Sequence, residues 1–133
     1  MEKGAISGLD VGVSRALFRL GLEADFSRSV EDDSRILLFA DKTNSGMLIG
    51  RGGKNAKRLS IMLEKELRVI EQTDDERKLI EKIISAPILG INKIYGKSEL
   101  YKVRMEKRFR QRAESLVPLV SKAIGKDVRM VFE

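Results

Sequence analysis

The stretch Gly46-Met47-Leu48-Ile49-Gly50-Arg51-Gly52-Gly53-Lys54-Asn55-Ala56-Lys57-Arg58 decides how the rest of the chain is interpreted. Its three glycines within four positions permit positive φ angles, and they leave the backbone amides open to a close ligand because glycine has no Cβ. The apolar spacing from Lys54 to about Lys65 predicts a helix, so the glycines lie at a helix N-terminus. Unpaired N–H groups and the positive end of the helix dipole favour an anion at that place. The stretch therefore predicts an anion-binding turn.

Positive charge surrounds this turn. Its basic residues are Arg51, Lys54, Lys57 and Arg58. No acidic residue occurs between Asp41 and Glu64. The whole chain of 133 residues has a formal net charge of +6, and its isoelectric point is near 9.7. This balance favours an anionic partner such as nucleic acid, although so many charged residues would also suit a solvated surface.

The composition excludes several kinds of functional site. The chain has no cysteine and no histidine, so it lacks thiolate ligands, the commonest metal ligand and the commonest general base. We therefore expect no metal centre, no catalytic triad and no cofactor. No apolar run reaches the roughly 18 residues of a membrane-spanning helix, and no secretory leader is evident. These features predict a soluble, cytoplasmic protein that has no membrane partner.

Apolar periodicity and turn residues predict the same order of elements in both halves of the chain. In the first half the order is a helix, a two-stranded hairpin, a short helical turn, the glycine turn, a longer helix and a strand. The corresponding residues are 10–20, 22–30 and 35–40, 47–49, 50–53, 54–65 and 67–70.

The second half begins with a capping box, Thr73 to Glu76, in which Thr73 is expected to cap a helix. Strands at 88–95 and 99–104, a basic helical segment at 105–112, a helix at 115–124 and a strand at 128–132 follow. Aligning residues 65–70 on 126–131 gives an offset of 61, which places the glycine turn opposite Gln111-Arg112-Ala113-Glu114. We therefore predict an α+β chain of two domains, residues 1–72 with the glycine turn and residues 73–133 with a degenerate loop.

The segment Ile49-Gly50-Arg51-Gly52-Gly53-Lys54 resembles the Ile-Gly-x-x-Gly signature of KH domains, which clamp the backbone of about four nucleotides of a single strand. A helix and strands before the signature resemble the type II arrangement, in which helices cover one face of a three-stranded sheet. Two such units over nearly the whole chain resemble the archaeal NusA-like tandem KH proteins. The resemblance implies a non-catalytic protein that binds single-stranded RNA in transcription elongation or termination, with RNA polymerase as a candidate partner.

The resemblance also implies roles for individual residues. Gly50 and Gly53 would be the fixed glycines of the clamp, and Arg51 and Gly52 the variable pair. Ile49 would form part of an apolar floor for the bases. The rim would consist of Lys54, Asn55, Lys57 and Arg58.

The second unit departs from the motif at Gln111 to Glu114, because its side chains would block a phosphate. It would then bind through surface charge alone or pack against the first unit. A candidate auxiliary basic surface consists of Lys107, Arg108, Arg110 and Arg112. A solvated face is the alternative interpretation of this cluster.

Other interpretations of the glycine turn remain. It could be a tight connection between helices, although one positive φ angle would need only one glycine. A Walker loop requires Ser or Thr after its lysine, whereas Asn55 follows Lys54. The spacing also fails the Gly-x-Gly-x-x-Gly pattern of dinucleotide sites. The remaining functional alternatives are a ribosome-associated or RNA-processing KH protein and a docking module on RNA polymerase that binds no RNA.

Overall fold

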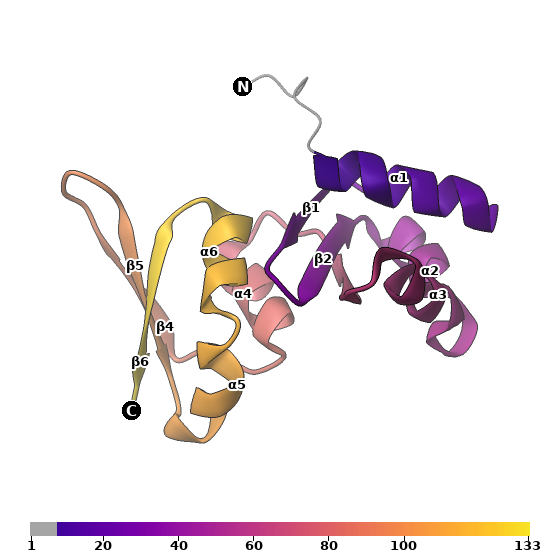
Figure 1. The fold of residues 1–133 in the computed structure, drawn as a ribbon. Coiled ribbons are helices and arrows are strands. Elements are labelled where there is room, and N and C mark those ends of the chain that lie inside the picture. Colours follow the sequence, from indigo (N-terminus) through magenta and orange to yellow (C-terminus); the bar gives the residue numbers. More distant parts are fainter. Residues whose placement is uncertain (1–7) are drawn as a thin grey trace. The chain divides into compact units, whose positions relative to one another are not determined.

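The computed structural model describes residues 8–133, so the first seven residues of the predicted first domain lie outside the described part. The chain forms two compact units, the first ending at Gln72 and the second beginning at Thr73. Each unit contains helices and a three-stranded sheet, which makes the fold α+β (Figure 1). The boundary between the units coincides with the one that the sequence predicts.

The first unit follows the predicted order of elements. It consists of α1 (Gly8–Leu20), β1 (Arg28–Glu31), β2 (Arg35–Ala40), α2 (Lys42–Ile49), the 3-10 turn η1 (Arg51–Gly53), α3 (Lys54–Leu63) and β3 (Glu66–Glu71). Strand β2 is central, pairing antiparallel with β1 and parallel with β3. The α2–η1–α3 segment therefore forms the crossover between two parallel strands, and the glycine turn lies in its middle.

The second unit repeats this topology. It consists of α4 (Glu76–Ile84), β4 (Gly90–Ile94), β5 (Leu100–Met105), the 3-10 turn η2 (Lys107–Phe109), α5 (Arg110–Glu114), α6 (Val117–Ile124) and β6 (Asp127–Phe132). Strand β5 is central, antiparallel to β4 and parallel to β6. Helices and strands therefore follow one another in the same order in both units, as predicted. Strands β3 and β6 are 61 residues apart at both ends, which equals the predicted offset.

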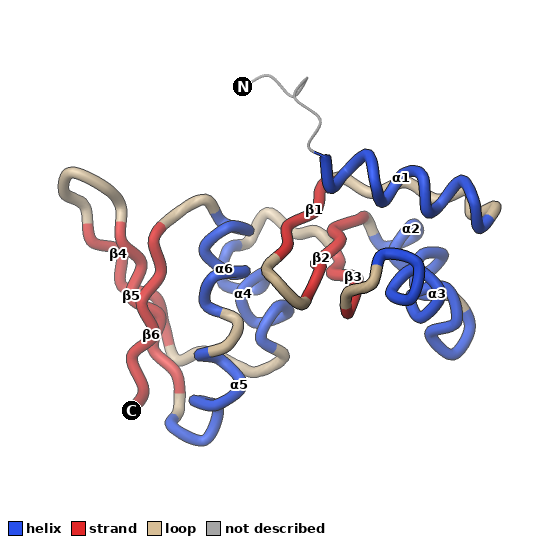
Figure 2. Tube along the Cα trace, in the orientation of Figure 1, coloured by secondary structure: helices blue, strands red, loops and turns tan. Residues whose placement is uncertain are grey.

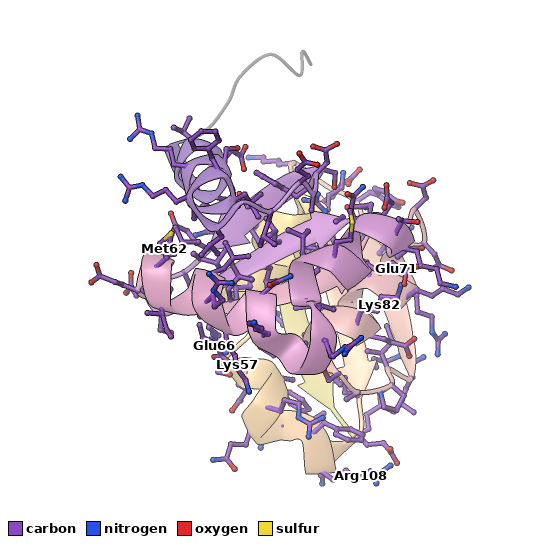
Figure 3. The ribbon with its side chains drawn as sticks, turned by 90° about the vertical axis from the view of Figure 1, so that its right-hand side faces the viewer. Lys57, Met62, Glu66, Glu71, Lys82 and Arg108 are labelled. Atoms are coloured by element: carbon purple, nitrogen blue, oxygen red, sulfur yellow. The ribbon has the colours of Figure 1, made fainter. Side chains whose placement is uncertain are left out.

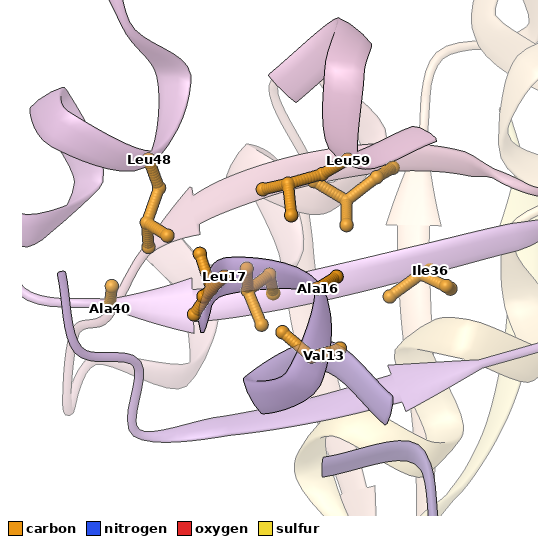
Figure 4. Close-up of a cluster of buried hydrophobic side chains, with 9 residues drawn as sticks. Val13, Ala16, Leu17, Ile36, Ala40, Leu48 and Leu59 are labelled. Atoms are coloured by element: carbon orange, nitrogen blue, oxygen red, sulfur yellow. The ribbon is translucent and has the colours of Figure 1, made fainter. Parts of the chain in front are cut away.

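The core of the first unit lies between its helices and one face of its sheet. Val13, Ala16 and Leu17 of α1 are buried with Leu59 of α3, as Figure 4 shows. They pack with alternate residues of the central strand, among them Ile36. The 3.6-residue spacing on α1 and the two-residue spacing on β2 therefore supply matching apolar faces. This packing holds α3 against α1 and the sheet, and so positions the glycine turn that precedes α3.

In the second unit, alternate residues of β5 are buried: Tyr101, Val103 and Met105. The hydroxyl of Tyr101 donates to Glu76 Oε1 of α4 at 2.8 Å, so this face of the strand is directed toward the helices. Helices α4 and α6 each contribute a buried apolar stripe, as their sequence spacing predicts.

Two local predictions were wrong. Strand β1 begins at Arg28, and the preceding residues 22–27 are not a strand, because the amides of Leu22 and Asp25 donate to Leu17 O and Asn44 Oδ1. Thr73 does not cap α4. The side chain of Asp75 accepts from the amide of Lys78 at the helix N-terminus, whereas Thr73 Oγ1 accepts from the amide of Asp75.

The described helices are short. The longest, α1, has 13 residues. Among residues 8–133, no helix has both the length and the apolar character needed to cross a membrane.

Candidate nucleic-acid interface

The backbone of the glycine turn has the conformation that the sequence predicts. Gly50, Gly52 and Gly53 all have positive φ angles, of 75°, 63° and 76°. At Gly50 the ψ angle is 172°, a combination that is essentially restricted to glycine. The turn thus uses all three glycines for their backbone freedom, and α3 begins directly after it at Lys54.

Hydrogen bonds inside the turn leave two amides free. The amide of Gly50 donates to Gly46 O at 2.9 Å, and the amide of Gly53 donates to Gly50 O at 3.1 Å. The amide of Lys54 donates to Arg51 O. The N–H groups of Arg51 and Gly52 find no acceptor within residues 8–133, and both residues are exposed. Two adjacent N–H donors are therefore available to an anion at the N-terminus of α3.

The side chain of Asn55 links the two helices that flank the turn. Its side-chain Nδ2 donates to Met47 O at 2.8 Å, which joins the first turn of α3 to the last turn of α2. A Cβ at Gly50 would lie 2.7 Å from Asn55 Nδ2 and 3.0 Å from its backbone N. The same addition at Gly52 or Gly53 would meet nothing within 4 Å. Position 50 therefore has no room for a side chain next to Asn55, whereas at Gly52 and Gly53 the absence of a side chain leaves the outer surface of the turn open.

The predicted cations belong to the turn and to the first half of α3. Four basic side chains are exposed and form no ion pair within the described residues: Arg51, Lys54, Lys57 and Arg58. Lys57 is labelled in Figure 3. Because neither the amides nor the cations are neutralised within the unit, the region presents positive potential to solvent.

An apolar groove lies beside the turn. It has a volume of about 410 Å³, and its lining residues are Gly21, Leu22, Glu23, Ala24, Met47, Gly50 and Asn55. Met47 is 43% exposed, whereas the following Leu48 is fully buried in the core. Ile49, the residue expected in the floor, is 39% exposed but does not line this groove. Ile49 therefore lies outside the groove, whose lining comes from Met47, from the segment after α1 and from Gly50 and Asn55.

The segment after α1 is held against α2. The amide of Asp25 donates to Asn44 Oδ1 at 2.9 Å, and the amide of Asn44 donates to the N-cap residue Asp41 at 2.8 Å. This hydrogen bond from the Asn44 amide lowers the pKa of Asp41 below its usual range. The far wall of the groove is thus attached to the first turn of the helix that leads into the glycine turn.

Sequence reasoning missed this wall because it comes from a segment far from the motif. The available signal was Gly21, whose φ angle of 69° ends α1 and turns the chain back toward α2.

The predicted position of the degenerate loop in the second unit is wrong. Gln111 to Glu114 belong to α5, and the connection to α6 consists only of Ser115 and Leu116 (Figure 2). Both connecting residues have negative φ angles, −71° and −100°. Without glycines the backbone stays right-handed, and the buried Ala113 holds the segment in the core as a helix. No anion-binding turn forms at this place.

The arginines of the auxiliary basic surface are engaged with their own unit. Arg108 lies 3.1 Å from Glu106, and Arg110 lies 3.5 Å from Glu114. Arg112 donates to Ser85 O at 2.6 Å. Lys107 is exposed and has no ion pair within the described residues. The auxiliary basic surface therefore has one cation without a partner among the described residues, Lys107, whereas the glycine turn and the start of α3 have four.

Residues 8–133 contain no group of three or more metal-ligating side chains. The titratable residues of the turn itself and of the start of α3 are cations, whereas Glu23 lines the adjacent groove, and the turn offers donors of hydrogen bonds. Free N–H donors next to cations favour an anion over a cation.

Comparison with known proteins supports the fold. No family model matches the chain, and no curated protein matches it. Among solved structures, the crystal structure of APE1850 is similar, with a TM-score of 0.72 over 92% of this chain and 96% of that one. The two sequences are 18% identical. At this identity the likeness bears on the α+β fold alone.

Proposed function

We propose that the chain binds single-stranded RNA through one KH-type clamp in its first unit. In this proposal both units have the type II KH fold, and the protein is a NusA-like, non-catalytic factor of transcription elongation or termination in the cytoplasm. The proposal unites the resemblance of the sequence motif with the geometry of the turn.

The free N–H groups of Arg51 and Gly52 are the observation that carries the proposal. They stand at the N-terminus of α3, where a backbone phosphate gains both hydrogen bonds and a favourable helix dipole. The groove beside Gly50 is apolar in part and open, so it suits bases that are not stacked in a duplex. A donor pair for phosphates beside a surface for bases favours a single strand over a nucleotide.

The second unit plays a different part in this proposal, because its α5–α6 connection has no free positive-φ turn. The three arginines of its auxiliary basic surface already contact protein groups, which leaves Lys107 as the cation of that surface most available to RNA. We therefore assign the second unit an accessory role. The resemblance implies RNA polymerase as the protein partner, and co-purification of polymerase with the tagged chain from the native host tests that part separately.

Fluorescence anisotropy with short, labelled single-stranded RNAs tests the clamp. We expect the variant Arg51→Asp/Gly52→Asp to lose binding, because it adds negative charge and side chains where a phosphate would lie. A matched control is Gly96→Asp/Lys97→Asp, which makes the same change of charge at an exposed turn of the second unit. Equal binding by wild type and clamp variant refutes the clamp. Equal losses in the clamp variant and the control indicate binding through general charge only.

Salt dependence locates the site independently. Each phosphate contact on a single strand contributes roughly 0.7 to the slope of log affinity against log salt. A clamp on about four nucleotides should therefore give a slope of about −3. Neutralising Lys107, Arg108 and Arg110 should leave most of that slope. A much steeper slope that this neutralisation abolishes would place the main site in the second unit.

A further inference from the structure

One exposed face of α1 combines an aromatic ring with unpaired cations. Phe18 is 87% exposed, and Val11 on the same face is 39% exposed. Arg15 and Arg19 lie beside Phe18 at helical spacing, and neither forms an ion pair within residues 8–133. A groove of about 470 Å³ runs between these side chains and Ser14, and no acidic residue lines it. A phenylalanine so exposed needs an explanation, since aromatic side chains ordinarily contribute to the core.

This face is linked to the groove of the proposed clamp by shared lining residues. Phe18 also lines a second groove of about 620 Å³, which includes Leu22, Glu23 and Ala24. The same three residues line the groove that reaches Gly50. All of these residues belong to the first unit. A ligand held at the glycine turn therefore lies beside the segment after α1, whose residues Leu22, Glu23 and Ala24 also line the groove at Phe18.

The charges along the path favour one orientation of a nucleic acid. Asp10, Glu23 and Asp25 line the groove between Phe18 and the segment after α1, so they repel phosphates from it. Arg15 and Arg19 line the groove on the other side of Phe18 and attract phosphates. Single-strand binding surfaces combine cations for the backbone with aromatic rings on which bases stack. This face of α1 has both.

We infer that RNA leaving the clamp crosses α1 and stacks a base on Phe18, while Arg15 and Arg19 contact its phosphates. This inference rests on the proposed function and extends the binding site from about four nucleotides to a longer segment. An acidic and apolar segment of a protein partner is the competing occupant, because it would also complement an aromatic ring between two cations.

The test compares RNAs of two lengths. Anisotropy is measured with pools of randomised single-stranded RNA, one of four nucleotides and one of ten, the tetramers by competition. Phe18→Ala should weaken decamer binding by about 5- to 150-fold, the range found when one stacked aromatic residue is removed. It should leave tetramer binding unchanged. Phe18→Tyr keeps a ring and should restore decamer binding. Tyr95→Ala removes an aromatic side chain that is 70% exposed in the second unit and serves as the matched control.

The arginines provide a second line of evidence. Arg15→Ser/Arg19→Ser should lower the salt slope for the decamer by roughly 1.4, which corresponds to two phosphate contacts. Decamer binding equal to wild type in both Phe18→Ala and the arginine variant overturns the inference. If tetramers still bind in that case and Arg51→Asp/Gly52→Asp abolishes their binding, the clamp stands without the extension. Failure of the wild type to bind either RNA refutes clamp and extension together.

A protein occupant gives a different pattern. If Phe18→Ala binds decamers as tightly as wild type but no longer retains a host protein that wild type retains, the face contacts protein and the inference is wrong. Because Phe18 is almost fully exposed, loss of folding is not expected, and circular dichroism of each variant verifies this.

Discussion

Substitution of Gly50 by alanine should destabilise the first unit more than the same substitution at Gly52, although the two glycines belong to one motif. At Gly50 the added methyl group would meet the side chain and backbone of Asn55 at 2.7–3.0 Å. Asn55 would have to move, and its hydrogen bond to Met47 O would break. At Gly52 the methyl group would enter open space.

The magnitudes follow from backbone strain and the lost hydrogen bond. A residue other than glycine in the conformation of Gly50 costs about 1–3 kcal/mol, and the broken hydrogen bond costs about 0.5–1.5 kcal/mol more. The lower entropy of unfolded alanine offsets about 0.4–1 kcal/mol. We expect a net loss of about 0.5–4 kcal/mol for Gly50→Ala. The left-handed conformation of Gly52 predicts about 1 kcal/mol for Gly52→Ala.

Urea denaturation followed by the amide NMR signals of residues 8–72 measures these losses in the first unit. The effect on RNA affinity, compared with the loss of stability, should be larger for Gly52→Ala than for Gly50→Ala. Gly52→Ala should weaken binding while the unit stays folded, because its methyl group stands beside the free amides. A loss of stability at Gly52 that equals or exceeds the loss at Gly50 would refute the division of roles.

Three further predictions concern the ends of helices. Asp75→Ala should lower the free energy of unfolding of the second unit by about 1 kcal/mol. Thr73→Ala should lower it by less, because Asp75 is the N-cap. If urea denaturation shows the reverse order, Thr73 is the cap, as the sequence predicted. Because the pKa of Asp41 is lowered in the fold, its contribution to stability is present above the usual aspartate pKa of about 3.9. It should be lost as the pH falls through the lower value of the folded state. Thermal unfolding from pH 7 to pH 2 should therefore show a shallower acid decline for Asp41→Asn, whereas parallel curves would contradict this cause. Glu64, which ends α3 with a φ angle of 59°, is in a conformation that favours glycine, so Glu64→Gly should raise the melting temperature, and a fall would contradict this explanation.

The sequence was sufficient for features that depend on neighbouring residues. The glycine turn, the helix after it and the repeated order of elements follow from φ preferences and apolar periods, which act within a few residues. The fully buried run Leu37-Leu38-Phe39 likewise lies in β2, inside the strand predicted at 35–40.

Features that depend on distant partners were not predictable in the same way. The groove wall at Gly21 to Ala24 meets Gly50 only because α1 packs on α3 and because Asn44 binds the amide of Asp25. The sequence alignment of the two halves with a constant offset of 61 assumes that the connection between the two crossover helices has the same length in both units. For this reason it placed a loop at Gln111 to Glu114, which are helical. In the structure the second unit has a connection of only two residues at this place.

The two units share devices that fix the crossover to the sheet. A lysine before the last strand pairs with a glutamate of the hairpin in both, Lys65 with Glu31 at 2.6 Å and Lys126 with Glu99 at 2.5 Å. The longer helix ends in both at a left-handed residue, Glu64 or Gly125. Each of these pairs of lysines and of left-handed residues is separated by 61 positions, the offset between strands β3 and β6.

The common fold of the two units helps to explain why the first unit has three glycines with positive φ angles. If the glycines were needed only to join two helices in the crossover, the second unit would need them too. It joins α5 to α6 through Ser115 and Leu116 with ordinary right-handed backbone and still forms the same sheet. The fold therefore does not require the glycine turn. Its free amides and unpaired cations are better explained by a ligand, which is why we propose that RNA binds at Gly50–Gly53 and not at the basic second half.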